Sequence, residues 1–209
     1  MPSTSSLPWF PSGPAARQND AVVETDQDPR IERSRRIILQ AVLDELGEVG
    51  YGALTIESVA ARAGVGKSTI YRHWANKPAL VEDAFRTMKA AAVIPDEGTL
   101  RERVIGFLEQ VARLIDESIY SSCMPALIDA AERDPQVRKF HVDFSNERIG
   151  MLVDVLRDAV KRGELPKGTD PELLAAALVG PIVMRRIMFY EPFDPKRVPA
   201  LVDQVMPRV

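Results

Sequence analysis

Residues 55–80, TIESVAARAGVGKSTIYRHWANKPAL, carry the pattern of two short helices, a tight turn and the start of a third helix. Apolar residues recur at helical spacing in the first half of this stretch. Thr55 can cap the first helix because its hydroxyl accepts a backbone N–H, and Gly64 can end it in the left-handed conformation. The stretch therefore predicts a helix, a turn at residues 64–66 and a second helix.

The second helix has an apolar face and a polar face. Ile70 and Trp74 lie four residues apart, so we expect both to point inward. The opposite face carries Lys67, Ser68, Tyr71 and Arg72. Such a helix, braced by the one before it, forms a helix-turn-helix whose second helix enters a major groove of DNA. Asn76 is then a good cap for a third helix, which tolerates Pro78 in its first turn.

Three segments resemble the DNA-binding signature of the TetR family of bacterial transcriptional regulators: TIESVAARAGV (55–65), STIYRHW (68–74) and NKPAL (76–80). The resemblance implies an all-α protein with an N-terminal three-helix helix-turn-helix DNA-binding domain. It also implies a C-terminal helical domain for ligand binding and dimerisation, and a regulator without enzymatic activity or cofactor. The chain departs from the family at Gly66, where the family often has a Ser or Thr cap. Glycine is only slightly worse as a cap, but it offers no hydroxyl to a phosphate.

The resemblance assigns roles to residues at the matching positions. Tyr71 and Lys77 are expected to hold phosphates, with Thr55 helping at the start of the first helix of the pair. Lys67, Ser68 and Arg72 are the candidates for contacts with base edges. The full expected DNA-binding set is Thr55, Gly66, Lys67, Ser68, Thr69, Tyr71, Arg72, His73 and Lys77.

The same residues also nearly match a phosphate-binding P-loop. Residues 61–68, ARAGVGKS, differ from that motif by an alanine in place of the first glycine, and Lys67 would serve a nucleotidase. A P-loop works only when it follows a buried strand and opens a helix. The preceding residues have helical spacing, so the context disfavours this alternative. No Ser/His/Asp arrangement or paired acidic site indicates another enzyme.

Composition excludes several kinds of site. The single cysteine, Cys123, excludes an intramolecular disulfide and a cysteine-based zinc site. His73 and His141 are the only histidines, and neither is paired with carboxylates at metal spacing, so we expect no metal. A reducing cytoplasm is the natural compartment for such a chain. The net charge is −3, but residues 30–77 alone carry +3. A positive charge concentrated in one segment favours binding of DNA phosphates there.

The flanking segments complete the expected domain organisation. Residues 1–29, rich in Pro and Ser, predict a disordered tail and not a signal peptide. We expect the DNA-binding domain at residues 30–76 and the ligand-binding and dimerisation domain at residues 77–209. The first helix is expected at residues 29–50, with an arginine cluster in its first turns. Its expected apolar side is formed by Ile31, Ile38, Val42, Leu46 and Val49. The cluster consists of Arg30, Arg33, Arg35 and Arg36. It is either a solvated face or a surface that steers the phosphates of DNA, and we favour the second.

Helical spacing continues through the rest of the chain, without strand alternation or an internal repeat. We expect helices at residues 77–92, 99–117, 121–133, 135–162, 170–190 and 195–206. The helix at residues 121–133 is expected to be interrupted by Pro125. Residues 173–184 are apolar throughout, too short to span a bilayer, and so predict a buried helix, most simply at a subunit interface. The family dimerises through its last two long helices. The expected interface residues are Leu174, Leu178, Pro181, Ile182, Arg185, Val198 and Val202.

The remaining apolar residues supply a candidate ligand pocket. The expected lining is Phe107, Val111, Cys123, Met124, Leu127, Ile128, Phe140, His141, Phe144, Met151 and Met184. The expected partners are a palindromic double-stranded DNA operator, a second copy of the chain and a small apolar or amphipathic ligand whose binding ends repression. The alternative within the same fold is a ligand-independent activator or DNA-organising protein, which a roomy pocket would oppose.

Overall fold

The computed structural model describes residues 29–87, 92–117 and 119–206, and these are helical throughout apart from turns and loops. The expected tail at residues 1–29 lies outside the described residues except for Pro29, which begins the first helix. The helices are α1 (Pro29–Ala53), α2 (Ile56–Ala63), α3 (Lys67–His73), α4 (Lys77–Arg86), α5 (Leu100–Glu117), α6 (Ile119–Arg133), α7 (Pro135–Arg162), α8 (Pro171–Met188) and α9 (Val198–Val205), with the short 3₁₀ turn η1 (Pro195–Arg197) before α9.

The helix ends follow the capping residues seen in the sequence. Thr55 accepts from the Ser58 backbone N–H and Asn76 from that of Ala79, as the cap pattern predicts. Gly64 ends α2 with φ 67° and ψ 34°. Asp134 and Asp170 cap α7 and α8 in the same way as the first two caps.

Three expectations for individual helices were wrong. α1 kinks at Gly50 (φ 76°, ψ 169°) and then runs on to Ala53. Of the expected apolar side of α1, Ile38, Val42 and Leu46 are buried, but Ile31 and Val49 are exposed. α4 ends at Arg86 and residue 92 is not helical, so the helix expected at residues 77–92 was too long.

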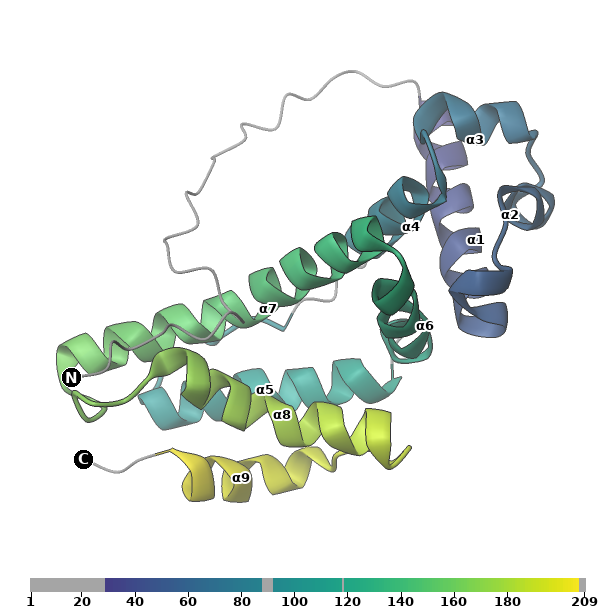
Figure 1. Cartoon of the computed structure of the whole chain (residues 1–209). Helices are drawn as coiled ribbons and strands as arrows, with labels where there is room; N and C mark the ends of the chain where they lie inside the picture. Colours follow the sequence, from purple (N-terminus) through teal and green to yellow (C-terminus); the bar gives the residue numbers. More distant parts are fainter. Residues whose placement is uncertain (1–28, 88–91, 118, 207–209) are drawn as a thin grey trace, which may run out of the picture.

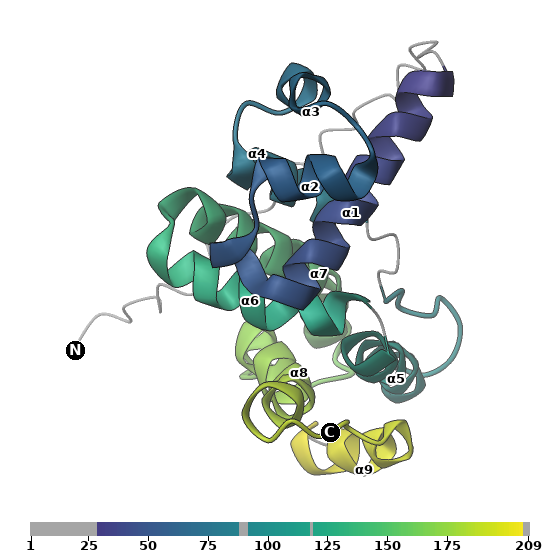
Figure 2. The same cartoon turned by 90° about the vertical axis from the view of Figure 1, so that its right-hand side faces the viewer.

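The helices form a head and a body that share α7. Figure 1 shows α1, α2 and α3 at one end, with the long α7 running away from them beside α4. α5, α8 and α9 lie together on the other side of α7, and α6 lies between the head and these helices. In the second view, α3 and α9 again lie at opposite ends of the molecule (Figure 2).

Two apolar cores hold this arrangement together. The first joins α1–α4 to α6 and to the first part of α7, through residues such as Cys123, Leu127 and Phe144. The second joins α5, the rest of α7, α8 and α9. α4 buries Leu80 and Phe85 in the first core, so the packing does not divide at the domain limit expected between residues 76 and 77.

α6 contains a proline whose structural cost is offset by α8. Pro125 has no N–H, so the carbonyl of Ser121, one turn earlier, loses its helical donor. Arg186 replaces that donor: its Nη2 lies 3.1 Å from Ser121 O, and its Nε lies 2.7 Å from Ser121 Oγ. α6 therefore stays continuous through Pro125, where the sequence predicted an interruption.

Candidate functional site

The short helix α3 is anchored to the head by its apolar face. Ile70 and Trp74 are buried, as their spacing predicts. Trp74 Nε1 donates to Asp83 Oδ2 on α4 over 2.8 Å, and Arg35 Nη2 on α1 lies 2.7 Å from both oxygens of the same carboxylate. These contacts fix the orientation of α3 on α1 and α4, so its outer face has a defined position.

The outer face of α3 is polar and open. Tyr71 is 55% exposed, and Lys67, Ser68, Arg72 and His73 are exposed beside it. Thr69 is half-buried, Gly66 caps α3 without a side-chain hydrogen bond, and Thr55 uses its hydroxyl as the cap of α2. α3 lies at the outer edge of the head in both views (Figures 1 and 2). A helix displayed in this way can enter a major groove, which is about 12 Å wide.

Lys67 does not point freely outward. Its Nζ lies 3.0 Å from Glu57 Oε1 on α2, and this pairing raises the pKa of Lys67. Both side chains are exposed, and ion pairs of that kind are weak and screened by salt. A phosphate or a base edge can therefore compete with Glu57 for this lysine.

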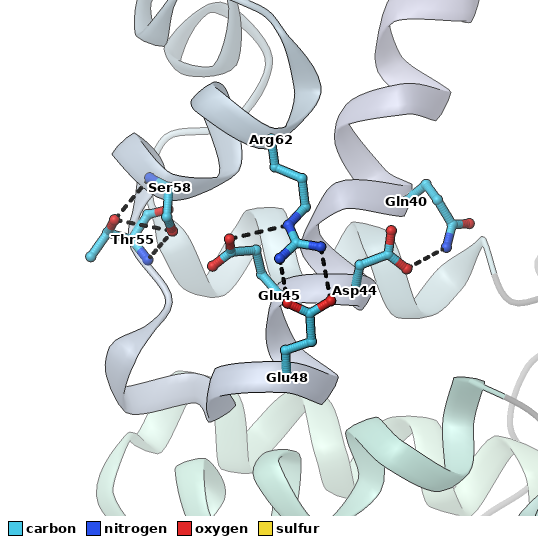
Figure 3. A network of polar contacts seen from close by, with 7 residues as sticks. All are labelled: Gln40, Asp44, Glu45, Glu48, Thr55, Ser58 and Arg62. Carbon is cyan, nitrogen blue, oxygen red and sulfur yellow. Dashed lines mark hydrogen bonds and ion pairs between the residues drawn. The ribbon is translucent and has the colours of Figure 1, made fainter.

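Arg62 holds α2 against α1. Its Nε lies 3.2 Å from Glu45 Oε1, and its Nη1 lies 3.0 Å from Glu48 Oε1 (Figure 3). These contacts raise the pKa of Arg62, mainly through the hydrogen bond to Glu48. Arg62 is thus a brace between helices, and nearby Thr55 and Ser58 complete the cap at the other end of α2.

Two basic residues expected to face DNA are used inside the protein. Lys77 Nζ donates to the carbonyls of Tyr51 (2.9 Å) and Leu54 (3.1 Å) and lies 4.2 Å from the centre of the Tyr51 ring. Burial lowers the pKa of Lys77. Arg35 is held by Asp83, as described above. The Lys77 ammonium was expected to hold a phosphate, but in this structure it instead holds together the end of α1 and the start of the loop to α2.

The P-loop alternative fails on its structural context. The motif needs a strand before the loop, but residues 56–63 form α2. The loop is the turn of a helix-turn-helix, closed by Val65 N donating to Ala60 O over 3.0 Å. Lys67, the residue that would hold phosphate, is paired with Glu57.

The body contains a cavity of about 250 Å³ between α5, α6, α7 and α8. Six of the expected pocket residues line it: Phe107, Val111, Met124, Ile128, His141 and Met151. Other lining residues were not predicted from the sequence: Ala92, Leu114, Ile115, Ser145, Arg148, Ile149, Val179 and Val183. The spacing of Ser145 and Arg148 from His141, four and seven residues along α7, is the signal that places them on the same face.

The other five expected pocket residues lie elsewhere. Cys123 donates to Leu43 O on α1 over 3.2 Å, and burial raises the pKa of its thiol to about 11. Leu127, Phe140 and Phe144 belong to the first core. Met184 is 52% exposed on α8. They do not line the cavity, because helical spacing shows which residues share a face but not which neighbouring helix that face meets.

Comparison with known proteins agrees with this architecture. Residues 38–84 match the family described as bacterial regulatory proteins, tetR family, and residues 94–205 match the tetracyclin repressor-like C-terminal domain. The chain belongs to the TetR family. It is a helix-turn-helix transcriptional regulator. An uncharacterized HTH-type regulator of Mycobacterium tuberculosis is 32% identical over 87% of this chain and 90% of its own length.

Other TetR-family proteins share the sequence or the fold. The DNA-binding transcriptional repressor TetR of Mycobacteroides abscessus is 29% identical over 85% of this chain and 94% of its own. The crystal structure of the TetR family regulator SCO0332 superposes with a TM-score of 0.63 at 29% identity, covering 84% of this chain and 100% of the other. FadR from Bacillus subtilis, crystallised in complex with stearoyl-CoA, has a TM-score of 0.69 over 83% of this chain and 98% of its own, and its 16% identity shows the fold alone.

Most of the residues expected at the dimer interface lie inside their own subunit. Leu174, Leu178, Ile182, Val198 and Val202 are buried in the second core of their own subunit. Pro181 and Arg185 are half-buried, and Arg185 pairs with Glu191. The exposed face of α8 carries other apolar residues, including Leu173, Met184 and Met188.

No described helix is both long and apolar enough to cross a bilayer. Nowhere in residues 29–87, 92–117 and 119–206 do three or more His, Cys, Asp or Glu side chains gather in a way that suits a metal ion.

Proposed function

We propose that this chain represses transcription by binding a palindromic operator as a dimer and leaves the operator when a small molecule fills its body cavity. The observation that carries the proposal is the exposed polar face of α3, fixed on a buried apolar anchor. Lys67, Ser68 and Arg72 contact base edges in this scheme. Tyr71 holds a phosphate, while Thr55, Thr69 and His73 lie beside the contact. A regulator of this kind acts in the cytoplasm, where its DNA is.

The arginine cluster of α1 divides into two roles. Arg33 and Arg36 are exposed and can steer the phosphate backbone toward the head. Arg35 is the internal partner of Asp83, and the side chain of Arg30 lies outside the described residues. The phosphate-steering surface is therefore Arg33 and Arg36, and Lys77 is removed from the contacts assigned to DNA.

The outer face of α8 forms the dimer surface in this proposal. Leu173 and Met188 are each 65% exposed, and Met184 lies between them on the same face. Ala177 and Gly180 continue the stripe and allow a second helix to approach closely. Monomeric proteins rarely expose such a continuous apolar stripe. A two-fold dimer presents two copies of α3 at about 34 to 36 Å, the spacing of successive major grooves.

The shared helix α7 supports release by a ligand. One part of its surface lines the cavity, while Phe140 and Phe144 pack against Phe85 of α4 with ring centres 5.8 and 5.9 Å away. A ligand that moves α7 therefore also moves the helix attached to the head. It shifts the DNA-binding equilibrium only by its difference in affinity between the two conformations. A cavity of about 250 Å³ favours this regulator over a ligand-independent activator or DNA-organising protein.

Fluorescence anisotropy on DNA from beside the chain's own gene tests the proposal, with a scrambled duplex as the reference. Arg36→Met is expected to weaken binding to both duplexes alike. It is also expected to reduce the slope of log affinity against log salt concentration by about one unit. Tyr71→Phe is expected to weaken binding to both duplexes without changing the salt dependence, because it removes no charge. Arg72→Met is expected to relax the sequence preference, by roughly 1–3 kcal/mol at one base pair.

Lys161→Met is the matched control, since it removes an exposed cation at the far end of α7 from α3. It is expected to leave binding and specificity unchanged. Equal binding to both duplexes by the unmodified protein, or equal effects of Arg72→Met and Lys161→Met, would contradict the proposed role of α3.

A further inference from the structure

The cavity in the body has one polar wall. Its lining is apolar except for His141, Ser145 and Arg148, and all three come from α7. Their spacing of four and then three residues places them in a row on one helix face. None of the described lining residues is acidic. The cavity is therefore a hydrocarbon-lined space with a short polar strip that carries positive charge.

His141 has an unmet hydrogen-bonding need at this wall. Its Nδ1 is buried and has no hydrogen-bond partner among the described residues. Burial lowers the pKa of His141, so its imidazole is neutral near pH 7 and can present one N–H donor and one acceptor. Buried polar atoms of native proteins nearly always have a partner, so this nitrogen points to a bound group that supplies one.

Arg148 brings a cation whose position is fixed. Its guanidinium carbon lies 4.3 Å from the centre of the Phe144 ring, so the planar group rests on an aromatic face while lining the cavity. A guanidinium matches a carboxylate with two parallel hydrogen bonds, which a hydroxyl cannot form. Ser145, between the other two residues, adds a hydroxyl that can donate to the same oxygens.

We infer that the cavity binds a small carboxylic acid, with its hydrocarbon among the walls from α5, α6 and α8 and its carboxylate on the α7 strip. The inference rests on the proposed ligand-binding function and gives it a chemical class. A volume of about 250 Å³ equals about eight water-sized groups of ~30 Å³ each. That size fits acids such as octanoate and 3-phenylpropanoate.

The position of the carboxylate also links the ligand to the head. Arg148 rests on Phe144, and Phe144 meets Phe85 of α4 edge to face at 5.9 Å. An anion that draws Arg148 into the cavity changes the support of Phe144. The acid group therefore acts at the contact between α7 and α4, whereas the hydrocarbon acts only inside the body.

Calorimetric titration of the full chain tests the inference with pairs of equal size. Octanoate and 3-phenylpropanoate are compared with octan-1-ol and 3-phenylpropan-1-ol. We expect each acid to bind at least about tenfold more tightly than its alcohol, because only the acid forms charge-assisted hydrogen bonds. Arg148→Met is expected to remove this difference and to leave alcohol binding unchanged. Arg148→Lys keeps the positive charge but loses the two parallel N–H donors of a guanidinium. It is expected to retain only part of the affinity difference between acids and alcohols.

Two further variants keep the test decisive. Val183→Phe fills the cavity and is expected to abolish the binding of acids and alcohols alike. Ser145→Ala is the milder change at the polar strip and is used if Arg148→Met lowers the thermal midpoint. It is expected to weaken the binding of acids but not of alcohols. Alcohols that bind as tightly as acids, equal losses for both in Arg148→Met, or no binding of either acid at about 10 mM overturn the inference.

Operator anisotropy with the same acids separates this inference from the proposed function. Acids that bind through Arg148 but leave operator affinity unchanged contradict release by ligand while supporting the acid site. If alcohols release the operator as effectively as acids, release by a ligand is supported. The assignment of the polar strip to a carboxylate is then overturned.

Discussion

Gly64 ends α2 with a left-handed backbone, φ 67°, and a Cβ placed there meets no atom within 4 Å. Any cost of adding a side chain is therefore conformational and not steric crowding from neighbours. Gly64→Ala is expected to lower the free energy of unfolding by about 1 kcal/mol, since residues with a Cβ avoid this conformation. Urea unfolding followed by circular dichroism measures the change.

Gly52→Ala is the matched control for that measurement. Gly52 also has open space around its Cβ position, but its φ lies outside the left-handed region. There alanine is expected to be neutral or stabilising by up to about 1 kcal/mol, because it reduces the freedom of the unfolded chain. Equal effects of the two substitutions would remove the conformational explanation.

His141 gives the stability of the protein a dependence on acid. Burial lowers its pKa below the ordinary value of 6.5, so the unfolded chain binds more protons than the folded chain in the interval between the two. Stability therefore falls as pH drops below about 6.5 and levels off below the folded pKa. Arg148, in the same cavity lining, is a cation and does not reverse this sign.

His141→Phe isolates that contribution. Urea unfolding at pH 7.5 and at pH 5.5 is expected to show a smaller loss of stability in acid for the variant than for the unmodified protein. Ordinary carboxylates titrate in both proteins and cancel in the comparison. An identical loss in both would show that His141 takes up its proton equally well in the folded and unfolded chains.

Single residues of the helix-turn-helix and its neighbouring caps could be predicted because they combine a motif with a local period. Thr55, Gly64 and Asn76 act within one turn of chain, so their roles do not depend on distant partners. Lys77 and Arg35 differ in this respect. Their partners are the Tyr51 and Leu54 carbonyls at the end of α1 and Asp83 on α4, and these become neighbours only when the head has folded.

At the scale of helices, α6 shows how one element depends on another. Pro125 leaves Ser121 O without its helical donor, and Arg186 of α8 fills the place. Arg186→Met is expected to destabilise the protein by about 1–3 kcal/mol, because a buried carbonyl is left without a partner. Denaturation midpoints measure this loss.

Arg113→Met provides the control for a lost arginine at a helix surface. Arg113 pairs with Glu109 at 3.5 Å across one helical turn, a weak exposed pair, so its loss is expected to change stability far less. A loss in Arg186→Met no larger than in Arg113→Met would show that water or another donor serves the Ser121 carbonyl equally well.

The helices themselves were largely predictable, because capping residues and apolar spacing are local signals. The errors have physical causes. The sequence cannot show that Arg186 supports α6 at Pro125, since Arg186 and the Ser121 carbonyl that it contacts lie 65 residues apart. The end of α4 was also missed, because apolar spacing continues beyond Arg86 without a proline or glycine until Pro95.

At the scale of the whole molecule, α8 was the hardest helix to interpret. Its apolar residues surround the axis, so period alone does not separate the side that packs inside the subunit from the side left outside. The fold makes that separation: Leu178 is fully buried, whereas Leu173 and Met188 are exposed. The same limit applies to the cavity, where neighbouring helices decide which apolar residues surround space and which fill it.

The exposed α8 stripe leads to a prediction about assembly. A two-fold dimer places each residue of the stripe near its own copy or a neighbour of it, so one substitution introduces two charges into one apolar contact. Leu173→Glu with Met188→Glu is therefore expected to raise the dimer dissociation constant by at least about a hundredfold, since like charges at an interface cost several kcal/mol. Sedimentation at several protein concentrations measures the constant.

DNA binding gives the second measure of the same variant. Loss of the dimer is expected to weaken binding to a full palindrome steeply and to a single half-site hardly at all, because α3 and its anchor are untouched. Val142→Glu is the control: Val142 is an exposed apolar residue on α7, outside the α8 stripe, and a charge there is expected to leave both measurements unchanged. A dimer that survives the double substitution would place the two-fold axis on another face, and the spacing of the two α3 helices would then have to be set from that face.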